Sequence, residues 1–390
     1  MVTGPKTRDF AMFSNAVKLF TLGGFDIKLD PSWFLIAGLI TWTLSAQYFP
    51  ATIPDQTPAT YLLLAIIAML GFFWSLLLHE LAHSLVARRF GVRIKGITLF
   101  LFGGVAELEA EPASARAELW IALAGPAMSL CLSVGFALLA AIASLASGGV
   151  ALSTVLGYLT TINLIIAVFN LVPAFPLDGG RVLRAYLWHR HGDVLRATRT
   201  AAQSGTFFGY GLTILGLLAL FQGAVTAGLW YILIGIFVLA AARSAFQNQL
   251  MQTAFDGKTA QHVMIRNPVT VSPELTLSEF VNQAMLHQRV SFAPVVADGV
   301  LIGQIDKDVL SAIDRENWTS TRVGDVFAGL DVAATIPPDM PVSDLLARIA
   351  RTGTRKFLVV DDHQLVGVVT LANLIGHLHA TDDAHQPHYW

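Results

Sequence analysis

Two histidines and a glutamate lie within five consecutive residues, in the segment HELAH at residues 79–83. On a helix, residues four positions apart lie on one face, about 6 Å apart along the helix axis. Two imidazole rings placed in this way can bind one zinc ion, with zinc–nitrogen distances of about 2.1 Å. Glu80 follows the first histidine and can reach a water molecule at the metal as a general base. The segment therefore predicts a hydrolytic zinc site in which His79 and His83 bind the metal.

The surroundings of this segment strengthen the prediction, because a short HExxH pattern also occurs by chance in helices of soluble proteins. The apolar stretch Tyr61–Ala87 contains no other Asp, Glu, Lys, Arg or His. A charged side chain at the centre of a membrane span costs at least about 2.5 kcal/mol. Three ionisable groups inside one span are therefore expected to serve a function rather than to fill a core.

A third metal ligand is expected, because catalytic zinc usually has three protein ligands and one open position. Asp178 is the candidate, in the segment FNLVPAFPLDGGRVLRA at residues 169–185. The prolines before it and the glycines after it break a helix and allow close approach of the backbone. A carboxylate at the edge of a span can also be a helix cap or a loop residue. The segment alone therefore leaves both interpretations open.

The composition indicates a membrane protein. Of the 390 residues, 54% are hydrophobic and only 13% are charged, and the mean hydropathy is +0.59. Soluble proteins have about 25% charged residues. The net charge of −2 gives no reason to expect a nucleic-acid partner. The single cysteine, Cys131, excludes a disulfide within the chain and is expected to be a small buried apolar residue.

Six apolar runs have the length, roughly 17–25 residues, that is needed to cross a bilayer. They are Ser32–Tyr48, Tyr61–Ala87, Leu119–Leu145, Leu152–Val172, Gly205–Phe221 and Thr226–Ala242. The connections 49–60, 146–151 and 222–225 contain no Lys or Arg, whereas the segments on the other side contain many. By the positive-inside rule, both termini and the basic loops are expected in the cytoplasm.

This topology brings the candidate ligands to a similar depth. His79 lies about 27 Å along its span from Tyr61, near the cytoplasmic end. Asp178 follows the cytoplasmic end of the span Leu152–Val172. The agreement is consistent with a shared metal site.

From about Phe255 the sequence has the composition of a soluble protein and contains two copies of one βαββα pattern. The segments VMIRNPVTVSPELTLSEFV and FLVVDDHQLVGVVTLANLI resemble the cystathionine-β-synthase (CBS) domain family. The expected fold is a polytopic α-helical membrane protein with six spans and short membrane-associated β-hairpins, followed by a soluble α/β tandem CBS domain. The expected organisation is an N-terminal segment with β-strands at 1–31, a membrane domain at 32–247, a linker at 248–257, the CBS pair at 258–380 and a disordered tail at 381–390.

HELAH in one span, followed by NLVPAFPLDGG after a later one, resembles the site-2 protease family of intramembrane zinc metalloproteases. The segments LFGGVAELEAEP and AGPAMS are also similar to that family. The resemblance implies one zinc ion per chain, bound by His79, His83 and Asp178, with Glu80 as the catalytic base. It also implies that Asn170 orients the substrate or stabilises the oxyanion, although a polar residue there can simply cap a helix end.

The stretch Gly96–Glu109 alternates in polarity and contains Gly103 and Gly104 at a turn. It could form a hairpin whose edge pairs with an unwound, extended substrate, and Lys18–Lys28 could form a companion strand pair. An ordinary interfacial loop is an equally good interpretation.

CBS pairs often bind adenine nucleotides through a glycine, a Thr or Ser, and an acidic residue three positions later. The second copy has Gly367, Thr370 and Asn373, with Asn in place of Asp, whereas the first copy has Asp306 and Val309 at the last two positions. Adenine-nucleotide binding is therefore doubtful. A homodimer through the CBS domains or a substrate-docking role is at least as well supported.

The resemblance implies substrates that are single-span membrane proteins, such as anti-sigma factors, transcription factor precursors or leftover signal peptides. The expected location is a bacterial or archaeal inner membrane, with both termini and the CBS domains in the cytoplasm. Two other functions remain open: a metal transporter or channel gated by the CBS pair, and a catalytically inactive membrane scaffold. A transporter would be expected to line several spans with polar residues, whereas here the polar groups concentrate at the predicted zinc site.

Overall fold

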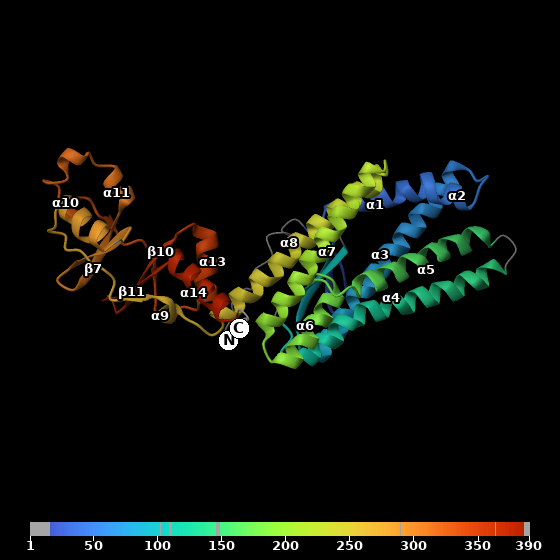
Figure 1. Cartoon of the computed structure of the whole chain (residues 1–390), viewed down its shortest axis with the longest axis horizontal. Helices are drawn as coiled ribbons and strands as arrows, with labels where there is room; N and C mark the ends of the chain where they lie inside the picture. Colours follow the sequence, from blue (N-terminus) through green and yellow to red (C-terminus); the bar gives the residue numbers. More distant parts are fainter. Residues whose placement is uncertain are drawn as a thin grey trace. The chain divides into compact units, whose positions relative to one another are not determined.

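The computed structural model of the chain describes residues 16–101, 103–108, 111–145, 149–288, 290–362 and 364–385 (Figure 1). Its internal contacts divide the chain into two compact units, residues 1–247 and residues 248–390. The first unit contains long apolar helices and one four-stranded sheet. The second unit contains two small sheets and short helices.

In the described part of the chain, five helices are long and apolar enough to cross a membrane. They are α3 (Pro58–Arg89), α4 (Ala115–Ser144), α5 (Val150–Asn170), α7 (Val194–Phe221) and α8 (Val225–Phe255). Many of their Leu, Ile, Val and Phe side chains are exposed, and lipid rather than water would cover an apolar surface of this extent. The chain is therefore an integral membrane protein. Cys131 is exposed on α4, so its predicted burial is wrong.

The first of the six predicted spans corresponds to three consecutive helical segments. They are α1 (Ser32–Thr43), the π-helix η2 (Leu44–Tyr48) and α2 (Phe49–Thr52). The π-helix interrupts the α-helical hydrogen bonding, so no single helix here has the length of a span. The count of six spans therefore stays a prediction.

A four-stranded sheet in the order β1-β2-β3-β4 accompanies the helices. Its strands are β1 (Val17–Leu22), β2 (Phe25–Leu29), β3 (Ile94–Phe100) and β4 (Gly103–Leu108). The pairs β1–β2 and β3–β4 are antiparallel, which confirms both predicted hairpins, and β2 pairs with β3 in parallel. Ile27 and Ile97 of this sheet pack on Ile36 of α1 and Phe73 of α3. The sheet is thereby fixed against the helix that carries HELAH.

Helix α4 packs against α3, α5 and the shorter helix α6 (Asp178–His191). Ser114 caps α4 by accepting a hydrogen bond from the Ala117 amide, which satisfies one of the free donors at a helix start. Between α5 and α3, the fully buried Asn163 donates a hydrogen bond to Ser75 over 3.1 Å. The three helices α4, α3 and α6 thus meet around one point, where the candidate site lies.

The second unit has the predicted repeat. The first copy contains α9 (Ala260–Val263), β5 (Ile265–Arg266), α10 (Leu277–Phe280), the π-helix η3 (Val281–His287), β6 (Phe292–Ala297), β7 (Val300–Asp306), α11 (Lys307–Ser311) and the 3₁₀ helix η4 (Arg315–Asn317). The second copy contains α12 (Val323–Val326), β8 (Ala328–Gly329), β9 (Thr335–Ile336), α13 (Val342–Thr352), β10 (Lys356–Asp361), β11 (Gln364–Thr370) and α14 (Leu371–Ala384). The sheets have the orders β6-β7-β8 and β5-β11-β10-β9, so each contains a short strand of the other copy.

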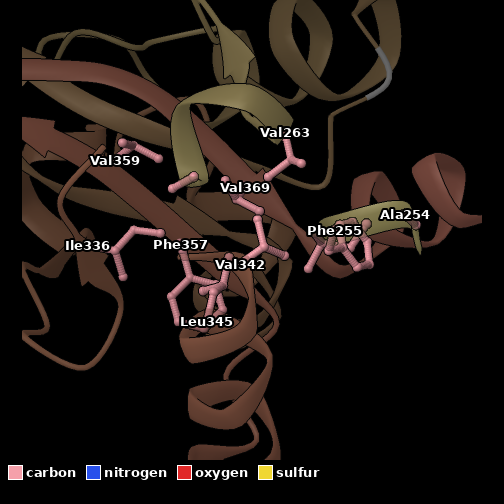
Figure 2. Close-up of a cluster of buried hydrophobic side chains, with 11 residues drawn as sticks. Ala254, Phe255, Val263, Ile336, Val342, Leu345, Phe357, Val359 and Val369 are labelled. Atoms are coloured by element: carbon pink, nitrogen blue, oxygen red, sulfur yellow. The ribbon is translucent and has the colours of Figure 1, made fainter. Parts of the chain in front are cut away.

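The core of the second copy includes the end of the preceding helix. Ala254 and Phe255, the last two residues of α8, pack with Val342, Leu345 and Phe357 (Figure 2). Residues 248–255, in the segment predicted as a linker, are therefore helical. At the other end, residues 381–384 of the predicted disordered tail belong to α14, and residues 386–390 lie outside the described residues.

Candidate metal centre

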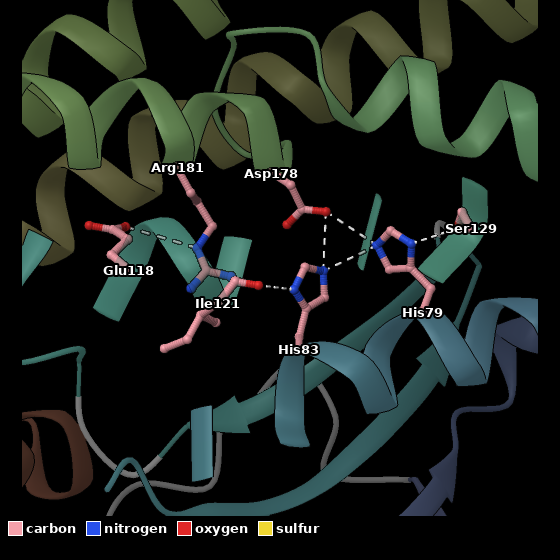
Figure 3. A network of polar contacts seen from close by, with 7 residues as sticks. All are labelled: His79, His83, Glu118, Ile121, Ser129, Asp178 and Arg181. Atoms are coloured by element: carbon pink, nitrogen blue, oxygen red, sulfur yellow. Dashed lines mark hydrogen bonds and ion pairs between the residues drawn. The ribbon is translucent and has the colours of Figure 1, made fainter. Parts of the chain in front are cut away.

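Three side chains from two helices converge on one point (Figure 3). His79 and His83 come from α3, and Asp178 is the first residue of α6. The Nε2 atoms of the two histidines lie 3.2 Å apart, and Asp178 Oδ2 lies 3.2 Å from His79 Nε2 and 3.1 Å from His83 Nε2. Only 3%, 6% and 8% of these three residues is exposed. Within the described ranges, this is the one group of His, Cys, Asp or Glu side chains arranged to hold a metal ion.

The other ring nitrogen of each histidine contacts α4. His83 Nδ1 donates a hydrogen bond to the Ile121 carbonyl over 2.6 Å, because a carbonyl oxygen can only accept. His79 Nδ1 lies 2.9 Å from the Ser129 hydroxyl, which can accept in the same way. In a neutral imidazole, a proton on Nδ1 leaves the lone pair on Nε2. With a proton on each Nδ1, both Nε2 lone pairs face the Asp178 carboxylate.

This donor set fits a zinc ion. Two lone pairs and a carboxylate oxygen that approach within 3.2 Å of one another repel unless a proton or a metal ion lies between them. Ligand atoms on a tetrahedron with zinc bonds of about 2.0–2.1 Å are separated by about 3.3–3.4 Å. Metal-binding histidines commonly donate their other N–H to a carbonyl or similar acceptor. The distances and the hydrogen bonds therefore both match a metal centre of His79, His83 and Asp178.

The backbone of α4 passes directly beside the two histidines at Gly125. A Cβ atom at this position would overlap the Nε2 atoms of both His79 and His83 and would lie 2.6 Å from His83 Cε1. Gly125 is buried. The absence of a side chain at this residue thus leaves open the space in which an ion would lie.

Asp178 is positioned by a tightly packed turn between α5 and α6. The amide of Phe175 donates a hydrogen bond to the Ala201 carbonyl of α7 over 3.3 Å. Gly179 and Gly180 lie so close to the backbone of residues 171–175 that a side chain at either position would overlap it. The glycines after Asp178 therefore allow α6 to begin against the preceding turn, with its first carboxylate directed at the histidines.

Glu80 lies under the edge strand of the sheet. A Cβ atom at Gly104 of β4 would lie 2.5 Å from Glu80 Cγ and 3.1 Å from Cδ. Gly103 begins β4 with a φ of 138° and has open space beside it. Asn170 is the half-buried last residue of α5. The strand that contains Gly103 and Gly104 therefore lies beside Glu80, the predicted general base.

Sequence reasoning did not identify the partners of the histidines. Gly125 and Ser129 both belong to the AGPAMS segment, whose residue types indicate a family resemblance but no contact with the histidines. Ile121 acts through its backbone carbonyl, which no residue type would indicate.

The candidate nucleotide residues form a helix cap. The Thr370 hydroxyl accepts a hydrogen bond from the Asn373 amide over 3.2 Å and pairs with its side-chain oxygen. In the first copy, Asp306 caps α11 and forms an ion pair with Lys356 over 3.0 Å. Burial raises the pKa of Asp306, but hydrogen bonds from Lys356 and two backbone amides outweigh it and hold that pKa below its usual value. Both candidate positions thus have structural partners within the protein.

Comparison with known proteins identifies relatives of both units. The model of "Peptidase family M50" matches residues 67–148 and 141–215, and the model of the CBS domain matches residues 260–315 and 324–380. A protein of Mycobacterium tuberculosis named "Putative zinc metalloprotease Rip3" is 37% identical over 359 residues, which are 91% of each chain. "Zinc metalloprotease MJ0392" of Methanocaldococcus jannaschii is 31% identical over 303 residues, 78% of this chain and 82% of that protein. A solved site-2 protease from the same archaeon has 28% identity and a TM-score of 0.42, covering 59% of this chain and 95% of that one.

Proposed function

We propose that His79, His83 and Asp178 hold a zinc ion and that Glu80 is the general base of this chain, which belongs to peptidase family M50 and is a zinc metalloprotease. The observation that carries this assignment is the convergence of three potential metal-ligand atoms, from three buried residues, at mutual distances of 3.1–3.2 Å. The relatives named zinc metalloproteases favour an enzyme over a CBS-gated transporter or channel.

The residues around this point have complementary roles in hydrolysing a peptide bond. Zinc held there supplies a Lewis acid for the scissile carbonyl and makes the attacking water more acidic. Glu80 accepts a proton from that water while the water oxygen forms a bond to the carbonyl carbon of the substrate. Glu80 then delivers the proton to the leaving nitrogen as the C–N bond breaks. The side-chain amide of Asn170 is the proposed donor to the oxyanion.

We propose that the substrate binds as an extended strand along β4. This strand is the edge of its sheet, and an edge presents unpaired backbone groups that can pair with a peptide. Gly104 of β4 packs on the side chain of Glu80. A peptide paired along β4 would therefore pass beside the general base with its carbonyl groups freed from helical hydrogen bonds.

Replacing Gly104 by alanine is expected to slow cleavage without weakening metal binding. The added methyl group would displace the Glu80 side chain, and misplacing a reacting group by about 1 Å can cost about 100-fold in rate. The test measures the turnover of a single-span substrate by the purified protein, together with its zinc content by atomic absorption. Wild-type kcat in Gly104→Ala would contradict the proposed placement of Glu80 beneath β4.

The proposed substrates are single-span membrane proteins, such as anti-sigma factors, transcription factor precursors or leftover signal peptides. A substrate of this type is consistent with an active site built on membrane helices. The proposed orientation places the basic loops, both termini and the CBS pair in the cytoplasm of a bacterial or archaeal cell. Cleavage would then occur toward the cytoplasmic side.

We propose a regulatory role for the CBS pair. Thr370 and Asn373 are candidates for contact with an adenine nucleotide, but they already satisfy one another as a helix cap. A homodimer through the CBS domains, or docking of the substrate's soluble part, accounts for the pair at least as well.

Removing the metal is expected to abolish proteolysis reversibly. Lewis-acid catalysis contributes several kcal/mol, so the rate should fall more than about 100-fold. The measurement is cleavage of a single-span substrate by the detergent-solubilised full chain after chelation and again after zinc is added back. His79→Ala should remain inactive after the addition. Undiminished cleavage by verified metal-free protein would overturn the proposed function.

A further inference from the structure

In the described part of the chain, the printed contacts to the Nδ1 atoms of both histidines come from one face of α4. Ile121 and Ser129 contact the Nδ1 atoms, and Gly125 lies against the Nε2 atoms. These residues are four positions apart, so they share a helix face. Glu118 lies on the same face, three residues before Ile121. One face of helix α4 therefore contacts both histidines of the metal centre and also carries Glu118.

Glu118 forms an ion pair with α6, the helix that begins at Asp178. Arg184 Nε donates a hydrogen bond to Glu118 Oε1 over 2.6 Å, and its Nη2 also contacts that oxygen. Arg181 Nε lies 4.0 Å from the same atom (Figure 3). Glu118 is fully buried and Arg184 is only 7% exposed. The carboxylate of α4 therefore contacts two cations on successive turns of α6.

These contacts act close to Asp178. Asp178 and Arg184 are six positions apart, which corresponds to a rise of about 9 Å along a helix. The guanidinium of Arg184 also lies over the Phe175 ring, 5.3 Å from its centre, in the turn that precedes Asp178. A change in the angle between α6 and α4 at Arg184 would therefore move the Asp178 carboxylate relative to the histidines.

The energetics favour orientation over stability as the role of this pair. Burying an ion pair costs about as much as its attraction returns, so such a pair often contributes no more stability than an apolar contact. The Glu118 Oε2 atom is also buried without a hydrogen-bond partner among the described residues. The geometry, by contrast, is specific, because a guanidinium directs its N–H groups in fixed directions.

From these contacts we infer that Glu118 and Arg184 are positioning residues that set the place of the Asp178 carboxylate in the metal centre. One helix, α4, then orients all three ligands: the histidines through Ile121 and Ser129, and Asp178 through the ion pair with α6. The inference rests on the proposed role of Asp178 as a metal ligand.

The test is Co²⁺ binding to the detergent-solubilised full chain, followed by the visible absorption bands that report four-coordinate cobalt. Outer partners of metal ligands typically affect metal affinity by about 10- to 100-fold. Glu118→Gln and Arg184→Met should weaken binding within that range and alter the bands. Arg184→Lys, which keeps the charge, should recover part of the loss. If Glu118→Gln does not fold, Arg184→Met tests the inference in its place, and Arg184→Lys is expected to bind with an affinity between those of Arg184→Met and the wild type.

Ser133→Ala is the matched control. Ser133 is a buried residue of α4 whose hydroxyl donates a hydrogen bond to the Thr160 carbonyl of α5 over 2.9 Å. This variant should lose stability but bind Co²⁺ with wild-type affinity and bands. Wild-type affinity in Glu118→Gln or Arg184→Met would overturn the inference. Wild-type affinity in Asp178→Asn would instead overturn the proposed ligand set, which separates the two failures.

Discussion

Replacing Glu80 by glutamine is expected to abolish cleavage while zinc stays bound. Glutamine has nearly the same shape but cannot accept a proton from water at neutral pH. General acid–base catalysis contributes about 10²–10⁴-fold, and kcat should fall by that factor. His79, His83 and Asp178 are unchanged in this variant, so the metal content should remain one ion per chain. Cleavage of a single-span substrate and atomic absorption on the same preparation provide the two measurements.

Glu316→Gln makes the same chemical change at an exposed residue of the second unit. It should cleave at the wild-type rate, which would show that loss of one carboxylate elsewhere has no effect. Unchanged cleavage by Glu80→Gln would rule out Glu80 as the general base. Loss of zinc from Glu80→Gln would mean that this residue contributes to metal binding, and the fall in rate could no longer be assigned to proton transfer.

The two histidines were predictable because their relation is local. A spacing of four residues on a helix places both rings on one face, and this holds whatever the rest of the chain does. The Nε2 atoms lie 3.2 Å apart in the structure. Asp178 is 95 residues after His83, and its position depends on how α6 begins. Loop charges could give its depth in the membrane, but not the packing of the turn at residues 171–177 that directs it.

The rest of the site depends on helix packing, which no local pattern determines. Glu118 would be interpreted from sequence as a favourable acidic residue in the first turn of a helix. Its ion pair with Arg184 exists only because α4 and α6 pack together. The division of the first predicted span into α1, η2 and α2 was likewise not indicated by its hydropathy, since a π-helix changes hydrogen bonding without changing composition.

Gly125 is important to the site because no side chain fits at its position beside the two histidines. The two Nε2 atoms beside Gly125 cannot move away easily. The His83 ring is held by its Nδ1 hydrogen bond to the Ile121 carbonyl, and the His79 ring by the contact of its Nδ1 with Ser129. Both histidines also belong to a continuous helix, α3. A methyl group at Gly125 would therefore have to displace α4 or push the rings away from Asp178.

Gly125→Ala is accordingly expected to weaken zinc binding by about 100-fold or more, at or beyond the upper end of the effect of disturbing a ligand's surroundings. Competition with a chelator of known affinity measures this. Gly135→Ala, on the same helix, is the matched control, because a Cβ atom there meets nothing within 4 Å. It should keep wild-type affinity and gain up to about 1 kcal/mol of stability from helix propensity. Equal zinc affinities in the two variants would mean that the histidines move freely, and that the metal does not occupy the space beside Gly125.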